Sequence, residues 1–147
     1  MERLDYPPVW LAGFVALAAL IARLVPGPEL GMAGSLAGAV LLVLGILLVV
    51  LAAMRFRRAA TTIVPHREPD ALITTGIYRY SRNPIYLADL LILSGLALLF
   101  DAPVALVLVP VFGYVLVRRF IAPEEARLRA AFGTAFDDYA RRTRRWL

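Results

Sequence analysis

Apolar residues dominate four stretches of this chain, and polar residues fall mainly between and after them. The stretches cover residues 9–25, 31–54, 84–100 and 103–117. A membrane helix needs about 20 predominantly apolar residues to cross a hydrocarbon core of about 30 Å. The second stretch satisfies this length without a single charged residue. The pattern therefore predicts an all-α, polytopic membrane bundle of about four spans.

The breaks between the stretches predict how the spans connect. Pro26, Gly27 and Pro28 end the first span, since neither residue type continues a helix well. Only Asp101 and Ala102 separate the third stretch from the fourth, so these two form a tight helical hairpin. The second span carries small residues that allow another helix to approach closely, namely Gly34, Ala37, Gly38 and Gly45.

Composition and charge support a membrane location. The chain is 61% hydrophobic and 18% charged, whereas a soluble domain has roughly half and about a quarter. All 16 basic residues are Arg, and nearly all lie in residues 55–83 or after residue 117. Because Arg and Lys gather on the cytoplasmic side, both termini and the long loop are predicted to be cytoplasmic, in a prokaryotic inner or cell membrane. Arg residues that flank apolar runs favour a bilayer, and not nucleic acid, as partner.

The residue types that are missing exclude several kinds of chemistry. Without cysteine there is neither a disulfide framework nor a thiolate metal site, and one histidine, His66, excludes a multi-histidine site. We therefore predict no metal. Few groups could act as a base: His66, Asp70, Asp89 and the pair Glu124 and Glu125. His66 lies in a proline-flanked loop, where a surface histidine is the simpler interpretation.

The two polar segments have different patterns. Residues 55–83 contain prolines and Gly76, and a connector of this length is usually functional or disordered. The tail predicts one amphipathic helix over residues 123–141. Its apolar positions recur at spacings of four, four and three, at Leu128, Phe132, Phe136 and Tyr139. Glu125 lies close to this stripe and Glu124 at its edge, although Glu125 could instead pair with Arg129.

The polar loop ends in a motif rich in Tyr and Arg, from Gly76 to Ala88. Asn83 can cap the third span and Pro84 can occupy its first turn. A helix N-terminus offers N–H groups and positive potential to a carboxylate. The motif also supplies flat aromatic faces suited to an adenine, at Tyr78, Tyr80 and Tyr86. The alternative is a simple girdle of Tyr and Arg at the membrane interface.

The order of these motifs resembles the superfamily of isoprenylcysteine carboxyl methyltransferases and phospholipid methyltransferases, which are membrane enzymes. The matching positions are Leu72, Thr74, Gly76 and Tyr78, then Arg82, Asn83, Pro84 and Tyr86, then Glu124 and Glu125, then Phe132, Gly133 and Tyr139, and finally Arg145, Trp146 and Leu147. The resemblance covers residues 61–147, with a helical hairpin between the two main motifs. It implies a single methyltransferase domain whose cofactor loop is residues 61–83.

The resemblance implies that S-adenosylmethionine is the cofactor and that a lipophilic or membrane-embedded carboxylate, amine or thiol is the methyl acceptor. The implied cofactor-binding residues are Leu72, Ile73, Tyr78, Asn83, Pro84, Ile85, Tyr86, Glu124 and Glu125. Asn83 stands where many members have His. Phe120 stands where eukaryotic members have an Arg that contacts substrate, with Arg119 beside it. We take Arg119 and Asp89 as the candidate catalytic residues.

Two other classes of protein remain open at this point. A carboxylate within a membrane span is costly and usually functional, so Asp89 could serve a small four-span transporter. Alternatively Asp89 lies near the interface and bonds Ser81 or an Arg. A non-catalytic scaffold is also possible, and within the enzyme class, N-methylation of a phospholipid competes with carboxyl methylation of a prenylated cysteine.

Overall fold

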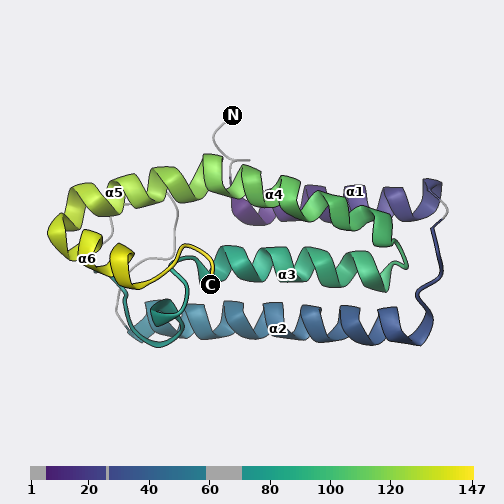
Figure 1. Ribbon diagram of the computed structural model, residues 1–147, viewed down its shortest axis with the longest axis horizontal. Helices are drawn as coiled ribbons and strands as arrows, with labels where there is room; N and C mark the ends of the chain where they lie inside the picture. Colours follow the sequence, from purple (N-terminus) through teal and green to yellow (C-terminus); the bar gives the residue numbers. More distant parts are fainter. Residues whose placement is uncertain (1–5, 26, 59–70) are drawn as a thin grey trace.

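The computed structural model describes residues 6–25, 27–58 and 71–147, and every regular element in these ranges is helical. Four helices run side by side and two more extend beyond one end (Figure 1). In chain order the elements are α1 (Pro7–Leu24), α2 (Gly31–Arg58), the short 3₁₀-helix η2 (Gly76–Arg79), α3 (Pro84–Leu99), the 3₁₀-helix η3 (Pro103–Val107), α4 (Leu108–Leu116), the π-helical turn η4 (Val117–Ile121), α5 (Ala122–Phe132) and α6 (Thr134–Arg142).

The predicted polytopic helical bundle is confirmed. Within the described residues, three helical segments are long and apolar enough to cross a membrane: Pro7–Leu24, Gly31–Arg57 and Pro103–Phe132. The fourth, α3, has only 16 residues, about 24 Å at 1.5 Å per residue. It lies between α2 on one side and α1 and α4 on the other (Figure 1). Neighbouring helices, and not lipid alone, therefore surround this shorter span.

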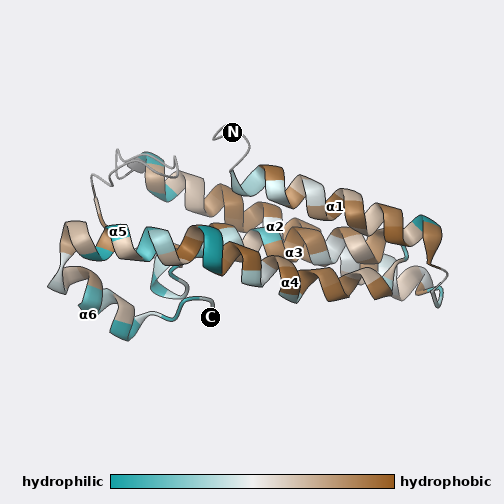
Figure 2. Ribbon diagram, turned by 90° about the horizontal axis from the view of Figure 1, so that it is seen from above, coloured by the Kyte–Doolittle hydropathy of each residue, from teal (hydrophilic) through white to brown (hydrophobic). Residues whose placement is uncertain are grey.

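The outer faces of the spans are apolar. Figure 2 shows hydrophobic ribbon along α1 to α4, and polar residues gathered in α5 and α6. Large apolar side chains on α2 are exposed, among them Met32, Leu36, Val40 and Val43. An aqueous surface rarely carries so continuous an apolar face, but a lipid-facing surface requires one. The exposed face of α2 is therefore the face that contacts the bilayer.

Small residues bring α2 and α3 into close contact. A Cβ built on Gly95 of α3 would lie 2.7 Å from the carbonyl oxygen of Gly38, and one on Gly45 would lie 2.7 Å from Ile92 Cγ1. The prediction of close approach is thus confirmed at Gly38 and Gly45. It is wrong for Ala37, which is exposed. Backbones this close gain dispersion contacts, which hold membrane helices together without a hydrophobic driving force.

We expect Gly95→Ala to destabilise the bundle by about 1–3 kcal/mol, because the new methyl group would force two backbones apart. Gly113→Ala is the matched control, since its Cβ would meet only Leu90 side-chain atoms at 3.7 Å or more. Thermal melting of the purified protein in detergent measures both effects. Equal melting temperatures for the two variants would contradict the close approach of α2 and α3.

The helical tail is confirmed, but as two helices and not one. The predicted helix over residues 123–141 is interrupted at Gly133, whose φ of +52° ends α5 and turns the chain back into α6. Glycine adopts this backbone conformation readily, whereas a residue with a Cβ does not. The apolar stripe is consequently divided: Leu128 and Phe132 lie on α5, while Phe136 and Tyr139 lie on α6 and are buried.

The fourth span also continues further than predicted. It was expected to end at Val117, but helical structure runs on through η4 into α5. In η4 the Ala122 amide donates to the carbonyl of Val117, five residues back. Pro123, in the first turn of α5, has no N–H and its ring would clash with a carbonyl four residues back. The wider turn relieves that clash, so the helix passes from the membrane to the polar region without a break.

Candidate functional site

The motif at the start of α3 lies against the last residues of the chain, which we call the C-terminal strap (residues 143–147). The Arg82 amide donates to the carbonyl of Arg144 at 2.9 Å. Ser81 Oγ and Asn83 Nδ2 both donate to the carbonyl of Arg145, at 3.3 and 3.0 Å. The strap therefore fixes the backbone that leads into α3.

Helix α6 and the first residue of the strap, Thr143, hold the 3₁₀-helix η2 in the same way. The Tyr139 hydroxyl donates to the carbonyl of Tyr78 at 2.7 Å, and Thr143 Oγ1 donates to the carbonyl of Arg79 at 3.4 Å. Burial raises the pKa of Tyr139 to about 12, so its hydroxyl stays protonated as a donor at neutral pH. Arg82 Nη1 adds a bond to the carbonyl of Ala140 at 3.2 Å.

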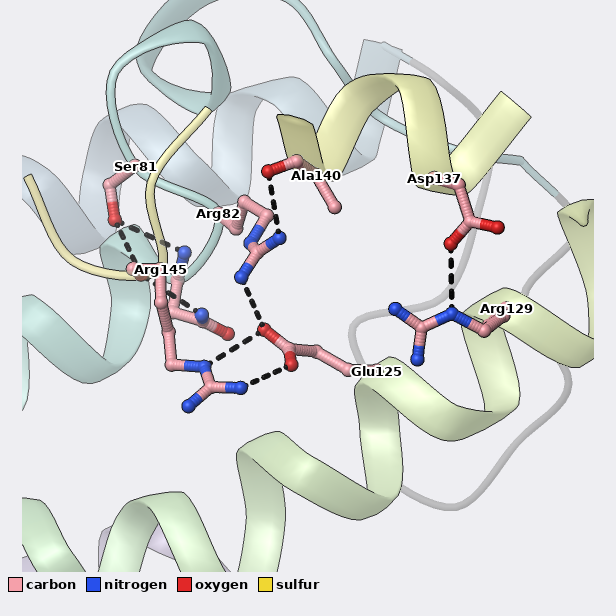
Figure 3. Close-up of polar contacts among 8 residues, drawn as sticks. Ser81, Arg82, Glu125, Arg129, Asp137, Ala140 and Arg145 are labelled. Carbon is pink, nitrogen blue, oxygen red and sulfur yellow. Dashed lines mark hydrogen bonds and ion pairs between the residues drawn. The ribbon is translucent and has the colours of Figure 1, made fainter. Parts of the chain in front are cut away.

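Glu125 of α5 contacts both the strap and the segment that leads into α3. Arg145 donates two hydrogen bonds to its carboxylate, from Nε at 3.1 Å and from Nη2 at 2.7 Å, and Arg82 Nη2 lies 3.1 Å from Oε1 (Figure 3). The Glu125 side chain is only 12% exposed. The hydrogen bonds with Glu125 raise the pKa of Arg145 above its ordinary value. We call Glu125, Arg82 and Arg145 the clamp.

The alternative prediction that Glu125 pairs with Arg129 is wrong. Arg129 lies 2.8 Å from Asp137 of α6, and not on Glu125 (Figure 3). The Arg129–Asp137 pair is about half exposed, with side chains 56% and 45% accessible. Exposed pairs of this kind contribute little to stability. The buried clamp is an ionic link between the tail and the loop.

Glu124 occupies a different environment from its neighbour. The Tyr86 hydroxyl donates to Glu124 Oε2 at 3.0 Å, and the Tyr86 ring stacks on Phe120 with centroids 6.4 Å apart. Burial, and then the charge of Glu124, raise the pKa of Tyr78 above its ordinary value, so Tyr78 stays neutral. The two adjacent carboxylates thus have different partners: Glu125 binds two arginines, and Glu124 accepts a hydrogen bond from Tyr86 at the start of α3.

A stretch of the chain that includes the start of α3 and both glutamates matches a known family of proteins. The profile of the phospholipid methyltransferase family matches residues 34–135, more than half of the chain. The chain belongs to this family. It is therefore an integral membrane protein of a methyltransferase family, which favours the enzyme hypothesis over the transporter and scaffold hypotheses. No curated protein and no solved structure matches the chain.

Within this phospholipid methyltransferase family member, Asn83 does not act as predicted. It is the residue before the first turn of α3, but its side chain makes no capping hydrogen bond. Its amide group is instead committed to the carbonyl of Arg145. The first turn, which begins at the fully buried Pro84, is thus left without a cap from Asn83.

The other residues that the sequence predicts for the site lie in several parts of the structure. Leu72, Ile73 and Ile85 are half-buried beside η2 and in the first turn of α3. Tyr80 is 71% exposed, whereas Tyr78 and Tyr86 are buried. Arg119 lies over the Trp10 ring, 5.1 Å from its centroid. His66, Asp70 and residues 61–70 of the cofactor loop lie outside the described residues.

Asp89 is buried in α3, one turn beyond Tyr86, and is 6% exposed. The predicted alternative of a bond to Ser81 is wrong, because Ser81 Oγ donates to the carbonyl of Arg145 and accepts from the Asn83 amide. Among the residues that the structure describes, Asp89 Oδ2 has no hydrogen-bond partner.

The sequence interpretation missed the hydrogen-bonding roles of Ser81 and Arg145. One signal pointed towards an arginine: Glu125 lies close to an apolar stripe, where a carboxylate needs a cation. Many arginines lie near Glu125 in the sequence, however, and the apolar stripe does not indicate which of them contacts Glu125 in the folded protein.

We expect Gly76→Ala to cost more stability than Gly133→Ala. Both glycines have positive φ, +64° and +52°, which costs a residue with a Cβ about 1 kcal/mol or more. Only at Gly76 would the Cβ also lie 2.2 Å from Arg55 Nε, at the end of α2. The difference between the two melting temperatures isolates the displacement of Arg55. A larger loss for Gly133→Ala would contradict the packing of α2 on η2.

Proposed function

We propose that this protein transfers a methyl group from S-adenosylmethionine to a lipophilic acceptor at the cytoplasmic face of the membrane. The supporting observation is that the two adjacent glutamates have different partners. Glu125 is bound by two arginines, whereas Glu124 accepts a hydrogen bond from Tyr86 at the start of α3. The start of α3 is also where the apolar spans give way to the polar tail helices (Figure 2).

The chemistry of these residues fits S-adenosylmethionine. Its amino-acid part carries an ammonium and its ribose carries hydroxyls, and both are suitable donors to the Glu124 carboxylate. Its carboxylate suits the positive potential at the N-terminus of α3, where Asn83 supplies no cap. Tyr78, Tyr86 and the apolar side chains of Leu72 and Ile73 offer surfaces for the adenine.

The bound cofactor supplies a methyl group already activated by a sulfonium. For such an in-line displacement, the protein's main task is to hold the acceptor atom at the right place and angle. The sulfonium loses its charge as the carbon–sulfur bond breaks, so apolar surroundings around it favour the transition state. The stacked Tyr86 and Phe120 rings, buried together at the membrane side of Glu124, supply such surroundings.

Cofactor binding and methyl transfer test this proposal directly. Titration of the detergent-solubilised protein with S-adenosylmethionine should give saturable heat and a higher melting temperature. Incubation with methyl-labelled cofactor and a membrane lipid extract should then transfer label to an extractable lipid. A titration that shows neither heat nor a melting shift at saturating cofactor would overturn the proposal.

The proposed orientation places the site in the cytoplasm, where S-adenosylmethionine is made and used. Arg residues gather at the α5 and α6 end of the bundle, consistent with the positive-inside rule. A reporter that is active only in the cytoplasm, fused after Leu147, should be active in cells. Activity only from a reporter that requires export would show that the orientation is reversed.

A further inference from the structure

One face of the fourth span is exposed, while the opposite face is buried in the bundle. The buried side chains follow one another at intervals of four residues, at Phe112, Leu116 and Phe120. The exposed side chains recur at intervals of three or four residues, which places them on a common face of η3 and α4. They are Val104, Val107, Val111 and Tyr114. Because three of these four residues are valines, lipid and not water is the suitable surroundings for this face.

The same face ends in arginine. Arg118 follows Tyr114 by four residues, so it lies on the same side of the helix and about 6 Å further along the axis. Its side chain is exposed, and within the part of the chain that the structure describes it makes no hydrogen bond or ion pair. The next residue, Arg119, is also exposed and lies over the Trp10 ring. Two positive charges therefore stand together at the polar end of an apolar face.

These arginines lie on the π-helical turn η4, and such turns are frequent at functional sites. Figure 2 shows that the ribbon changes from hydrophobic in α4 to hydrophilic towards α5. The turn is thus at the level where acyl chains give way to lipid headgroups. Along the helix axis, the apolar, phenolic and guanidinium groups follow the same order as the layers of one leaflet.

We propose that this face binds one anionic phospholipid of the leaflet beside the tail helices. We call it the lipid face, and it comprises Val104, Val107, Val111, Tyr114, Arg118 and Arg119. An acyl chain lies along residues 104–111, Tyr114 lies at the level of the ester groups, and the phosphate lies on the two arginines. A guanidinium binds phosphate through two parallel hydrogen bonds. A zwitterionic headgroup would add a cation beside these arginines, so the charges of the face favour a lipid with net negative charge.

The bound lipid acts as a structural ligand and not as the methyl acceptor. Phe120, the residue after Arg119, is buried on the other side of η4 and stacks on Tyr86 of α3. Arg119 also connects this turn to Trp10 of α1. A phosphate held on η4 therefore restrains the turn that joins the fourth span to two other spans. Because the lipid binds the folded bundle, it should raise the melting temperature.

The first test compares two lipids with the same acyl chains, dioleoyl phosphatidylglycerol and dioleoyl phosphatidylcholine, added to the protein in detergent. Neither can be methylated on nitrogen, since the first has no nitrogen and the second has a quaternary one, so the test is independent of the proposed function. Native mass spectrometry should show saturable binding of one phosphatidylglycerol, with a rise in melting temperature. Phosphatidylcholine should bind about fivefold more weakly or worse. Equal binding of the two lipids would overturn the proposal.

The second test removes one charge from the lipid face. Arg118→Gln should weaken phosphatidylglycerol binding about fivefold and leave the melting temperature without lipid unchanged. Arg142→Gln is the matched control, because Arg142 is also exposed but lies on α6, beyond the end of the spans (Figure 1). This control should bind phosphatidylglycerol like the unmodified protein.

Three results of the second test would overturn the proposal. Equal losses of affinity in the two variants would mean that overall charge, and not the lipid face, attracts the lipid. A lower melting temperature of Arg118→Gln without lipid would mean that the fold itself requires Arg118. A dimer in the mass spectrum that Arg118→Gln dissociates would mean that a second copy of the chain covers this face.

Discussion

Glu125→Ala should destabilise this protein by roughly 2–3 kcal/mol. Removing one partner of a buried ion pair leaves the other charge uncompensated, at a cost of about 3–5 kcal/mol when burial is complete. Here Glu125 and Arg82 are 12% and 15% exposed, but Arg145 is 39% exposed, so water compensates part of the loss. Thermal or denaturant unfolding in detergent measures the change.

The matched control for Glu125→Ala is Asp137→Ala, which breaks the half-exposed pair with Arg129 and should cost no more than about 1 kcal/mol. A double-mutant cycle between Glu125→Ala and Arg145→Ala should show strong coupling, because each removes the other's partner. Additive effects of the two substitutions would mean that the clamp does not link α5 to the strap.

The second large effect is expected on cofactor affinity and not on stability. Glu124→Gln keeps the size of the side chain but removes the charge beside Tyr86. A lost charge-assisted hydrogen bond is worth roughly 1.5–3 kcal/mol, or about ten- to a hundredfold in the Kd for S-adenosylmethionine. Isothermal titration should show this loss, while the melting temperature without cofactor should change little.

Glu125→Gln is the matched control for Glu124→Gln, since the residues are adjacent and the change is the same. Glu125→Gln should lower the melting temperature first, and any loss of affinity should follow from a loosened strap. The opposite pattern, with Glu125→Gln weakening binding in a fully stable protein, would exchange the roles assigned to the two glutamates. Unchanged affinity in both variants would mean that neither residue contacts the cofactor.

The division between the two glutamates bears on what the tail contributes to the site. The strap and α6 together form hydrogen bonds with the backbone or side chains of five residues that lead into α3, namely Tyr78, Arg79, Ser81, Arg82 and Asn83. A loop with that many partners is held in one conformation. Preorganisation of this kind lowers the cost of binding a cofactor, because less conformational freedom is lost.

Much of this protein could be predicted from the sequence because the decisive signals are local. Whether a stretch of residues can cross a bilayer depends on its own length and hydropathy, so the polytopic helical bundle was predicted correctly. The motifs were also enough to identify the superfamily, since they depend on residue types at fixed separations. Gly38 and Gly45 were identified as contact points because only small residues let backbones approach.

Other features depended on which distant segments fold together, and the sequence interpretation was wrong or silent there. Periodicity predicted a single tail helix, but periodicity does not report backbone φ, and the +52° at Gly133 divides it. Asparagine often caps helices, but the side-chain amide of Asn83 donates instead to the carbonyl of Arg145. Helical spacing predicted Arg129 as a possible partner of Glu125, but in the structure Arg145 of the strap binds Glu125. Hydrogen bonds form between groups that are close in space. Only the tertiary structure therefore determines which of the many arginines lies beside Glu125.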